Sequence, residues 1–156
     1  MDTARTRAVL TVLLLVTALQ SAPSQAQLAP AIQAELARSK YVYIATTRKD
    51  GSLGKAAEIW FLYHNGAVYV ASPPTAWRVR RIKAGRPGAK IAVGKPDGPS
   101  FIATGTVVNE PETYPILFET YAKKYPDGWP RFEEKFRSGL KDGSRVLIRY
   151  TPDQRQ

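Results

Sequence analysis

Two dipeptides that favour tight hairpin turns, Asp50-Gly51 and Asn65-Gly66, constrain the fold of this chain most. They separate three segments rich in β-branched and aromatic residues, at 41–47 (YVYIATT), 55–63 (KAAEIWFLY) and 67–71 (AVYVA). Asn-Gly and Asp-Gly tolerate the positive φ angles that two-residue hairpin turns require. The pattern therefore predicts three strands joined as an antiparallel meander.

The rest of the chain alternates between helical and strand periodicity. An amphipathic helix is expected over 114–125, where apolar residues recur at helical spacing and Thr113 is available as its cap. Six strands with inserted helices predict a mostly β fold with α insertions, in the form of a small closed or split antiparallel barrel. The remaining predicted helices are 28–38, 75–83 and a short one between Pro130 and Gly139, and the remaining strands are 90–95, 101–108 and 144–151.

The first 26 residues have the pattern of a secretory signal peptide. Arg5 and Arg7 precede an apolar run at 8–19, and small residues at 24 and 26 suit cleavage after Ala26. We therefore expect a Sec-type export signal and a single mature domain at 27–156, with a periplasmic or secreted location. The alternative is an uncleaved anchor, although the run is shorter than the roughly 20 residues that a membrane span needs.

The chain is strongly basic, with 23 Lys and Arg against 13 Asp and Glu and a formal net charge of +10. Cleavage after Ala26 would remove two basic residues and one acidic residue, leaving about +9. Such a domain attracts anions: a phosphorylated ligand, anionic lipid or nucleic acid. The absence of cysteine excludes thiolate chemistry and disulfide bonds.

The basic residues concentrate after the third predicted strand, where six Arg and Lys occur between Arg78 and Lys90 and no acid lies between Glu58 and Asp97. A helix that begins near Thr75 directly after a strand offers free N–H groups and a favourable dipole for a phosphate. The Thr75 hydroxyl and arginine side chains would add further donors. The candidate phosphate ligands are Thr75, Arg78, Arg80 and Arg81, with Trp77 as a flat apolar neighbour. A solvated basic helix face is the alternative.

Other catalytic arrangements find little support in the sequence. His64 is the single histidine and precedes a turn, so metal-ligand clusters and a Ser-His-Asp triad are not expected. Glu58 interrupts an apolar strand, and either faces water or faces a ligand inside the barrel. No nucleic-acid-binding motif occurs, and no nucleic-acid partner is expected.

Three consecutive stretches resemble the pyridoxamine 5′-phosphate oxidase-like family, the FMN-binding split barrels. These stretches are 44–72 (IATTRKDGSLGKAAEIWFLYHNGAVYVAS), 77–94 (WRVRRIKAGRPGAKIAVG) and 101–112 (FIATGTVVNEPE). The resemblance covers about residues 36–151, and it lies in the ordered series of segments more than in any one motif.

The resemblance implies a homodimer that binds FMN, or a deazaflavin relative, and acts as an oxidoreductase on a small molecule. By position, Arg78 matches the basic residue that binds the phosphate, and Ala71 and Ser72 match the strand end beside it. Thr46 and Thr47 match first-strand positions near the cofactor. The stretch from Ala57 to Trp60, which includes Glu58, matches the segment that lines the ring. The alternative is a non-catalytic module of the same fold that binds haem, a flavin or another anion.

Overall fold

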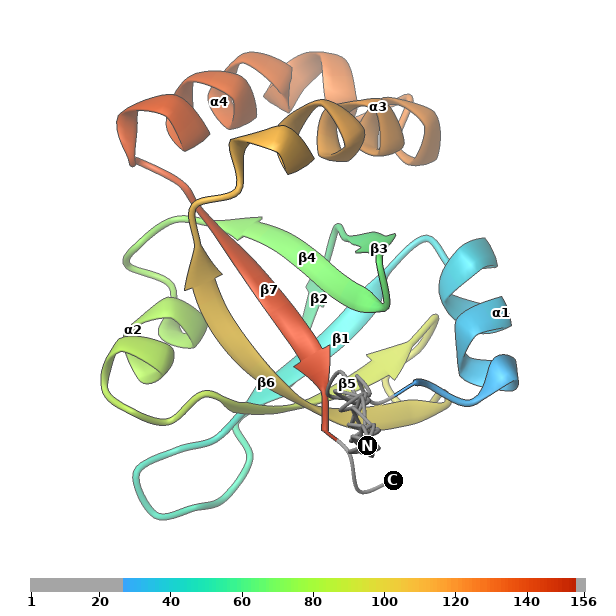
Figure 1. Ribbon diagram of the computed structural model, residues 1–156, viewed down its shortest axis with the longest axis vertical. Helices are drawn as coiled ribbons and strands as arrows, with labels where there is room; N and C mark the ends of the chain where they lie inside the picture. The colour runs from blue at the N-terminus through green and yellow to red at the C-terminus, as the bar shows by residue number, and fades with distance from the viewer. Residues whose placement is uncertain (1–26, 154–156) are drawn as a thin grey trace, which may run out of the picture.

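The computed structural model describes residues 27–153, so the predicted export signal lies outside the described residues. This part of the chain forms one antiparallel sheet and a set of helices packed around it (Figure 1). The helices are α1 (Pro30–Arg38), α2 (Trp77–Lys83), the 3₁₀ turn η1 (Pro111–Thr113), α3 (Tyr114–Lys124) and α4 (Trp129–Asp142). The strands are β1 (Val42–Thr46), β2 (Ala57–Ile59), β3 (Leu62–His64), β4 (Ala67–Ser72), β5 (Gly88–Val93), β6 (Ser100–Val108) and β7 (Val146–Pro152).

The sheet curls into a barrel that stays open along one seam. Its strand order is β2-β1-β5-β6-β7-β4-β3, so β2 and β3 are the two edge strands. Only Trp60 and Phe61 separate these edges in the chain, and the sheet must therefore bend until its edges meet. The predicted fold class, a mostly β split antiparallel barrel with helical insertions, is confirmed.

The predicted meander is wrong in one respect. The segment 55–63 does not form one strand, because it breaks at Trp60 and Phe61 into β2 and β3, which raises the number of strands from the expected six to seven. Within residues 27–153, β2 pairs with β1 alone, whereas β3 pairs with β4 and β4 also pairs with β7. The barrel opens at this break.

Two tyrosine hydroxyls, from Tyr121 in α3 and Tyr125 directly after it, bind the backbone at the break. The Tyr121 hydroxyl donates to the carbonyl oxygen of Trp60 at 2.9 Å. The Tyr125 hydroxyl accepts from the N–H of Phe61 at 3.0 Å and donates to the carbonyl oxygen of Lys40 at 2.8 Å. Tyr125 follows Tyr121 by four residues at the C-terminal end of α3, so both side chains reach the same break.

The turn predictions hold. Asn65 and Gly66 adopt φ angles of 48° and 75° and join β3 to β4, as a two-residue hairpin requires. Gly51 has φ 83° and lies at the tip of the long loop between β1 and β2, where the Asp50 side chain accepts from the Ser52 N–H at 3.0 Å.

Two apolar clusters occupy the two faces of the sheet. One fills the barrel and gathers inward-facing side chains such as Val42, Ile91 and Ile148, together with Val79 of α2. The other lies outside the barrel, where α3 and α4 cover β4 and β7 with Leu117, Tyr121, Phe136 and others. Figure 1 shows α3 and α4 side by side across one end of the barrel, with α1 and α2 on opposite flanks.

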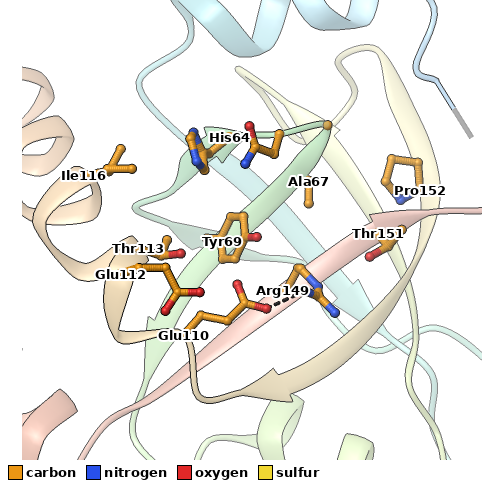
Figure 2. A pocket seen from close by; sticks show the side chains of 12 residues that line it. His64, Ala67, Tyr69, Glu110, Glu112, Thr113, Ile116, Arg149, Thr151 and Pro152 are labelled. Carbon is orange, nitrogen blue, oxygen red and sulfur yellow. Dashed lines mark hydrogen bonds and ion pairs between the residues drawn. The ribbon is translucent and has the colours of Figure 1, made fainter. Parts of the chain in front are cut away.

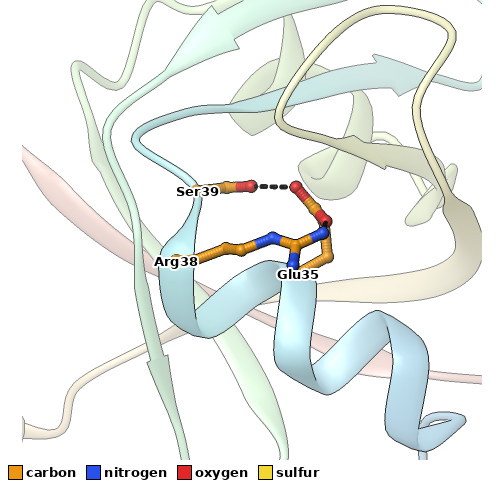
Figure 3. Close-up of polar contacts among 3 residues, drawn as sticks. All are labelled: Glu35, Arg38 and Ser39. Carbon is orange, nitrogen blue, oxygen red and sulfur yellow. Dashed lines mark hydrogen bonds and ion pairs between the residues drawn. The ribbon is translucent and has the colours of Figure 1, made fainter.

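Helix α1 ends at a small polar contact beside the turn that joins β5 to β6. The Glu35 carboxylate accepts from the Ser39 hydroxyl at 2.8 Å and also pairs with Arg38 (Figure 3). Both contacts hold the pKa of Glu35 below its usual value. A side chain at Gly94 would lie 3.0 Å from the Ser39 hydroxyl, so the turn approaches this contact closely.

Several helix ends differ from the sequence predictions. Helix α2 starts at Trp77 because Pro73 to Ala76 form a turn closed by the Ala76 N–H on the Pro73 carbonyl at 3.0 Å. Thr113 does not cap α3 through its side chain, since η1 leads into the helix. Helix α4 runs through Gly139 to Asp142 and ends at Gly143, which has φ 84°. Among residues 27–153, no helix combines the length and the apolar character that crossing a bilayer demands.

Candidate functional site

A cavity of about 310 Å³ beside α2 gathers positive charge. Its basic residues come from two places: Arg78 and Arg81 from α2, and Arg48 and Lys55 from the loop between β1 and β2. The remaining lining residues are Ile44, Thr46, Ala57 and Trp77, so no carboxylate of the described part of the chain lines the cavity. Four cations around one hollow favour an anionic ligand with more than one charge. We call this the basic cavity.

Arg78 is the most buried cation of the basic cavity. Its Nη1 donates to the hydroxyl of Ser72, which is fully buried, at 2.9 Å. Burial lowers the pKa of Arg78, and no carboxylate pairs with it in the described part of the chain. A buried guanidinium without a counter-charge is costly, and an anionic ligand would offset that cost.

A buried hydroxyl is electrostatically coupled to Arg78. The Tyr150 hydroxyl has no hydrogen-bond partner among residues 27–153, and burial raises the pKa of Tyr150 to about 12 while the charge of Arg78 lowers it. This region of the barrel therefore holds hydrogen-bonding capacity that the protein leaves unused.

Arg81 ties the basic cavity to strand β1. Its Nη1 donates to the Thr46 carbonyl at 2.9 Å and to the Thr46 hydroxyl at 2.7 Å. A side chain at Gly54 would lie 2.5 Å from the same nitrogen, so the loop carrying Lys55 packs directly against the guanidinium. These contacts fix the position of Arg81 and leave its other N–H groups for a ligand.

Trp77 is 65% exposed at the mouth of the basic cavity. The guanidiniums of Arg80 and Arg81 lie 4.7 and 5.6 Å from its ring centroid. An exposed indole with cations close to its ring offers a surface on which a planar ligand can stack.

The other predicted ligands lie outside the basic cavity. Arg80 is exposed over the Trp77 ring, and Thr75 is exposed two residues before α2, whose first turn receives no side-chain cap. The Thr47 hydroxyl donates to the Gly88 carbonyl at 2.9 Å. That these residues contribute to ligand binding stays a prediction.

A second cavity of about 300 Å³ contains three other predicted residues, Glu58, Trp60 and Ala71. Glu58 is exposed and accepts from the Tyr43 hydroxyl at 2.6 Å across the β1–β2 pair. It therefore lies at the wet rim and not inside the barrel. Ile59, Phe132, Phe136 and Arg145 complete the lining of what we call the aromatic cavity.

A third cavity of about 400 Å³ lies between the β3–β4 hairpin, β7 and the segment before α3 (Figure 2). It contains His64, and the centroids of the His64 and Tyr69 rings are 6.4 Å apart. Glu110 pairs with Arg149, while Glu112 is exposed beside them. This cavity thus carries acidic groups, in contrast to the basic cavity.

Sequence reasoning missed three cations that line the first two cavities: Arg48, Lys55 and Arg145. Arg48 and Lys55 flank the Asp50-Gly51 turn, so that hairpin signal could have indicated that they lie near each other. Arg145 carries no local signal, because only the packing of α4 against β7 brings it to Trp60.

No protein-family model matches the sequence, and no curated protein matches it either. Solved structures do match. A Listeria innocua protein assigned as a pyridoxamine 5′-phosphate oxidase superimposes with a TM-score of 0.57 at 16% identity, over 80% of this chain and 92% of that one. The chain has the split-barrel fold of the pyridoxamine 5′-phosphate oxidase-like proteins.

Two further split barrels match to a similar degree. The haem storage protein HutZ from Vibrio cholerae gives a TM-score of 0.54 at 16% identity, over 82% of this chain and 92% of that one. A Clostridium acetobutylicum protein of the pyridoxine phosphate oxidase family, related to general stress protein 26, gives 0.54 at 15% identity, over 78% and 81%. At these identities the likeness establishes the split barrel and leaves the ligand open.

Proposed function

We propose that this protein is an exported oxidoreductase that binds FMN, with the phosphate of the cofactor in the basic cavity. The observation that carries the proposal is a set of four cations around a hollow that no carboxylate of residues 27–153 lines: Arg48, Lys55, Arg78 and Arg81. A phosphate monoester carries up to two negative charges and accepts several hydrogen bonds, which matches these donors.

The residues of the basic cavity fit the rest of FMN as well. Trp77 is exposed at its mouth and Ile44 and Ala57 form an apolar wall, so a planar ring system has surfaces to contact. Bound FMN would supply hydride or electron transfer, while the protein binds and orients it. A phosphorylated deazaflavin would use the same cations and is the closest alternative cofactor.

The proposal extends to the assembly and location of the protein. The split barrels that this sequence resembles imply a homodimer, and the N-terminal pattern implies export with cleavage after Ala26. Sedimentation of the purified protein tests the first point. N-terminal sequencing of the protein from the culture medium or periplasm tests the second.

A titration with FMN and riboflavin tests the cofactor. Riboflavin lacks the phosphate, so we expect it to bind at least 10-fold more weakly than FMN. We expect Arg78→Met to weaken FMN binding by roughly 10- to 100-fold, since a charge-assisted hydrogen bond contributes about 1.5–3 kcal/mol. The matched control is Lys83→Met, an exposed cation on the same helix outside the cavity. Equal affinities for FMN and riboflavin would overturn the phosphate assignment.

Reduction of bound FMN by a nicotinamide donor, followed by reoxidation with an acceptor, separates an oxidoreductase from a non-catalytic module. A haem-binding module is the second candidate, because His64 lines the third cavity. Glu110 in that cavity is already paired with Arg149, and the exposed Glu112 would repel haem propionates, which favours FMN. A haem titration that gave a Soret band lost in His64→Ala would favour the module.

A further inference from the structure

The aromatic cavity contains a guanidinium, that of Arg145, while the carboxylate at its rim, Glu58, is engaged with Tyr43. Within residues 27–153, Arg145 forms no ion pair, and its Nε is buried without a hydrogen-bond partner. Burial lowers the pKa of Arg145, because the guanidinium loses part of its hydration. Native proteins leave few buried polar atoms unpaired, so this nitrogen needs an explanation.

The walls of the aromatic cavity are flat rings. The centroid of the Trp60 ring lies 5.9 Å from that of Phe132, in an edge-to-face arrangement. It lies 6.0 Å from the centroid of Phe136, in a stacked arrangement. Phe132 is 37% exposed, so part of this ring surface faces solvent. The Arg145 guanidinium lies 4.2 Å from the Phe136 centroid, which places charge and aromatic surface next to each other.

Two glycines allow this arrangement. A Cβ atom at Gly128 would lie 2.9 Å from the Trp60 ring, and one at Gly139 would lie 2.9 Å from the Arg145 side chain. Glycine inside a helix costs roughly 0.5–1 kcal/mol relative to alanine. Gly139 lies within α4, so the helix bears this cost at the position where the Arg145 side chain packs closely against it.

We propose that the aromatic cavity binds a small planar aromatic anion, such as a carboxylate on one or two fused rings. The anionic group pairs with Arg145, and the ring lies against Trp60 and Phe132. The volume of about 300 Å³ admits a ligand of this size. Glu58 at the rim, engaged with Tyr43, disfavours a second negative charge at the mouth. The proposal stands whether or not FMN binds in the basic cavity, which selects for phosphate through other residues.

A titration of the full chain without cofactor tests this proposal, with 2-naphthoate, 2-naphthylamine and naphthalene as probes. We expect 2-naphthoate to bind roughly 10- to 100-fold more tightly than the other two, because only it can pair with a guanidinium. Arg145→Gln should remove this preference. Arg137→Gln is the matched control, because Arg137 also lies over a phenylalanine ring, at 4.5 Å from Phe118, but pairs with Glu133.

Nuclear Overhauser contacts between 2-naphthoate and the wild-type protein provide a readout that needs no variant. We expect contacts to the Trp60 indole and the Phe132 ring. Three outcomes would each overturn the proposal. The three probes could bind with equal affinity, 2-naphthoate could contact only residues outside this cavity, or a dimer could bury this face and exclude 2-naphthoate. FMN titration in the presence of 2-naphthoate reports on the basic cavity separately, so failure of one proposal is distinguishable from failure of the other.

Discussion

The Tyr121 hydroxyl donates a hydrogen bond to the Trp60 carbonyl oxygen at 2.9 Å. A side chain of α3 thus pairs with the backbone at the point where β2 has ended and β3 has not yet begun. The aromatic cavity lies beside this break and contains residues of both β2 and β4.

Tyr121→Phe should therefore destabilise the protein by about 1–3 kcal/mol, because the part-buried Trp60 carbonyl would lose its hydrogen-bond partner. The measurement is the midpoint of urea unfolding at an unchanged m-value. Tyr114→Phe at the start of the same helix is the control and should change stability by less than about 0.5 kcal/mol. A Tyr121→Phe midpoint equal to wild type would show that water replaces the hydroxyl.

The sequence predicted those parts of the fold that depend on local chemistry. The Asn65-Gly66 turn forms as expected because its backbone angles are a property of the two residues themselves. The break at Trp60 and Phe61 could not be predicted, because 55–63 reads as a continuous apolar strand. The groups that satisfy this break, Tyr121 and Tyr125, lie about 60 residues later in the chain.

In the candidate site, too, local sequence patterns could be predicted and contacts made by tertiary packing could not. Arg78 and Arg81 belong to a dense basic run and were predicted as ligands, and both line the basic cavity. Arg80 belongs to the same run but points over Trp77, since neighbouring positions on a helix face different directions. Arg145 is brought to Trp60 only by tertiary packing.

Lys124 should make stability depend on pH. Its Nζ lies 3.4 Å from the Phe61 ring centroid without a carboxylate partner in the described residues, and burial lowers the pKa of Lys124 to about 8. The unfolded chain holds this proton up to a pKa near 10.5, so between these values it binds more protons than the folded chain. The contribution of Lys124 to stability thus rises from about pH 8 to about pH 10.5.

Lys124→Met is therefore expected to be more stable than wild type at pH 7, with an advantage that shrinks towards pH 10. The aromatic contact offsets part of the desolvation cost, so the gain should not exceed about 1 kcal/mol. Urea unfolding at pH 7, 8.5 and 10 measures it. Lys123→Met is the matched control, because its exposed ammonium pairs with Glu119 at 2.6 Å. A pH-independent difference would contradict the lowered pKa.

Gly128→Ala should disturb the aromatic cavity. The new methyl group would meet the Trp60 ring at 2.9 Å, and this ring stacks on Tyr125 with a centroid separation of 4.2 Å. Because relief of this contact would disturb the stacking of Trp60 on Tyr125, we expect a loss of about 1–3 kcal/mol and a shift in tryptophan emission. Glu134→Ala, on the exposed face of α4, should leave both unchanged. A stable variant with unaltered emission would mean that Trp60 can move freely.

Glu58→Gln separates the two cavities. Glu58 lies on the exposed face of β2, so the substitution should change the free energy of unfolding by less than about 0.5 kcal/mol. It removes a negative charge from the rim of the aromatic cavity and should tighten 2-naphthoate binding by roughly 2- to 5-fold at low salt. FMN affinity should stay within twofold, because Glu58 does not line the basic cavity. Glu134→Gln controls for the change in net charge. If Glu58→Gln instead altered FMN binding and left 2-naphthoate binding unchanged, Glu58 would act on the cofactor, as the sequence resemblance implied.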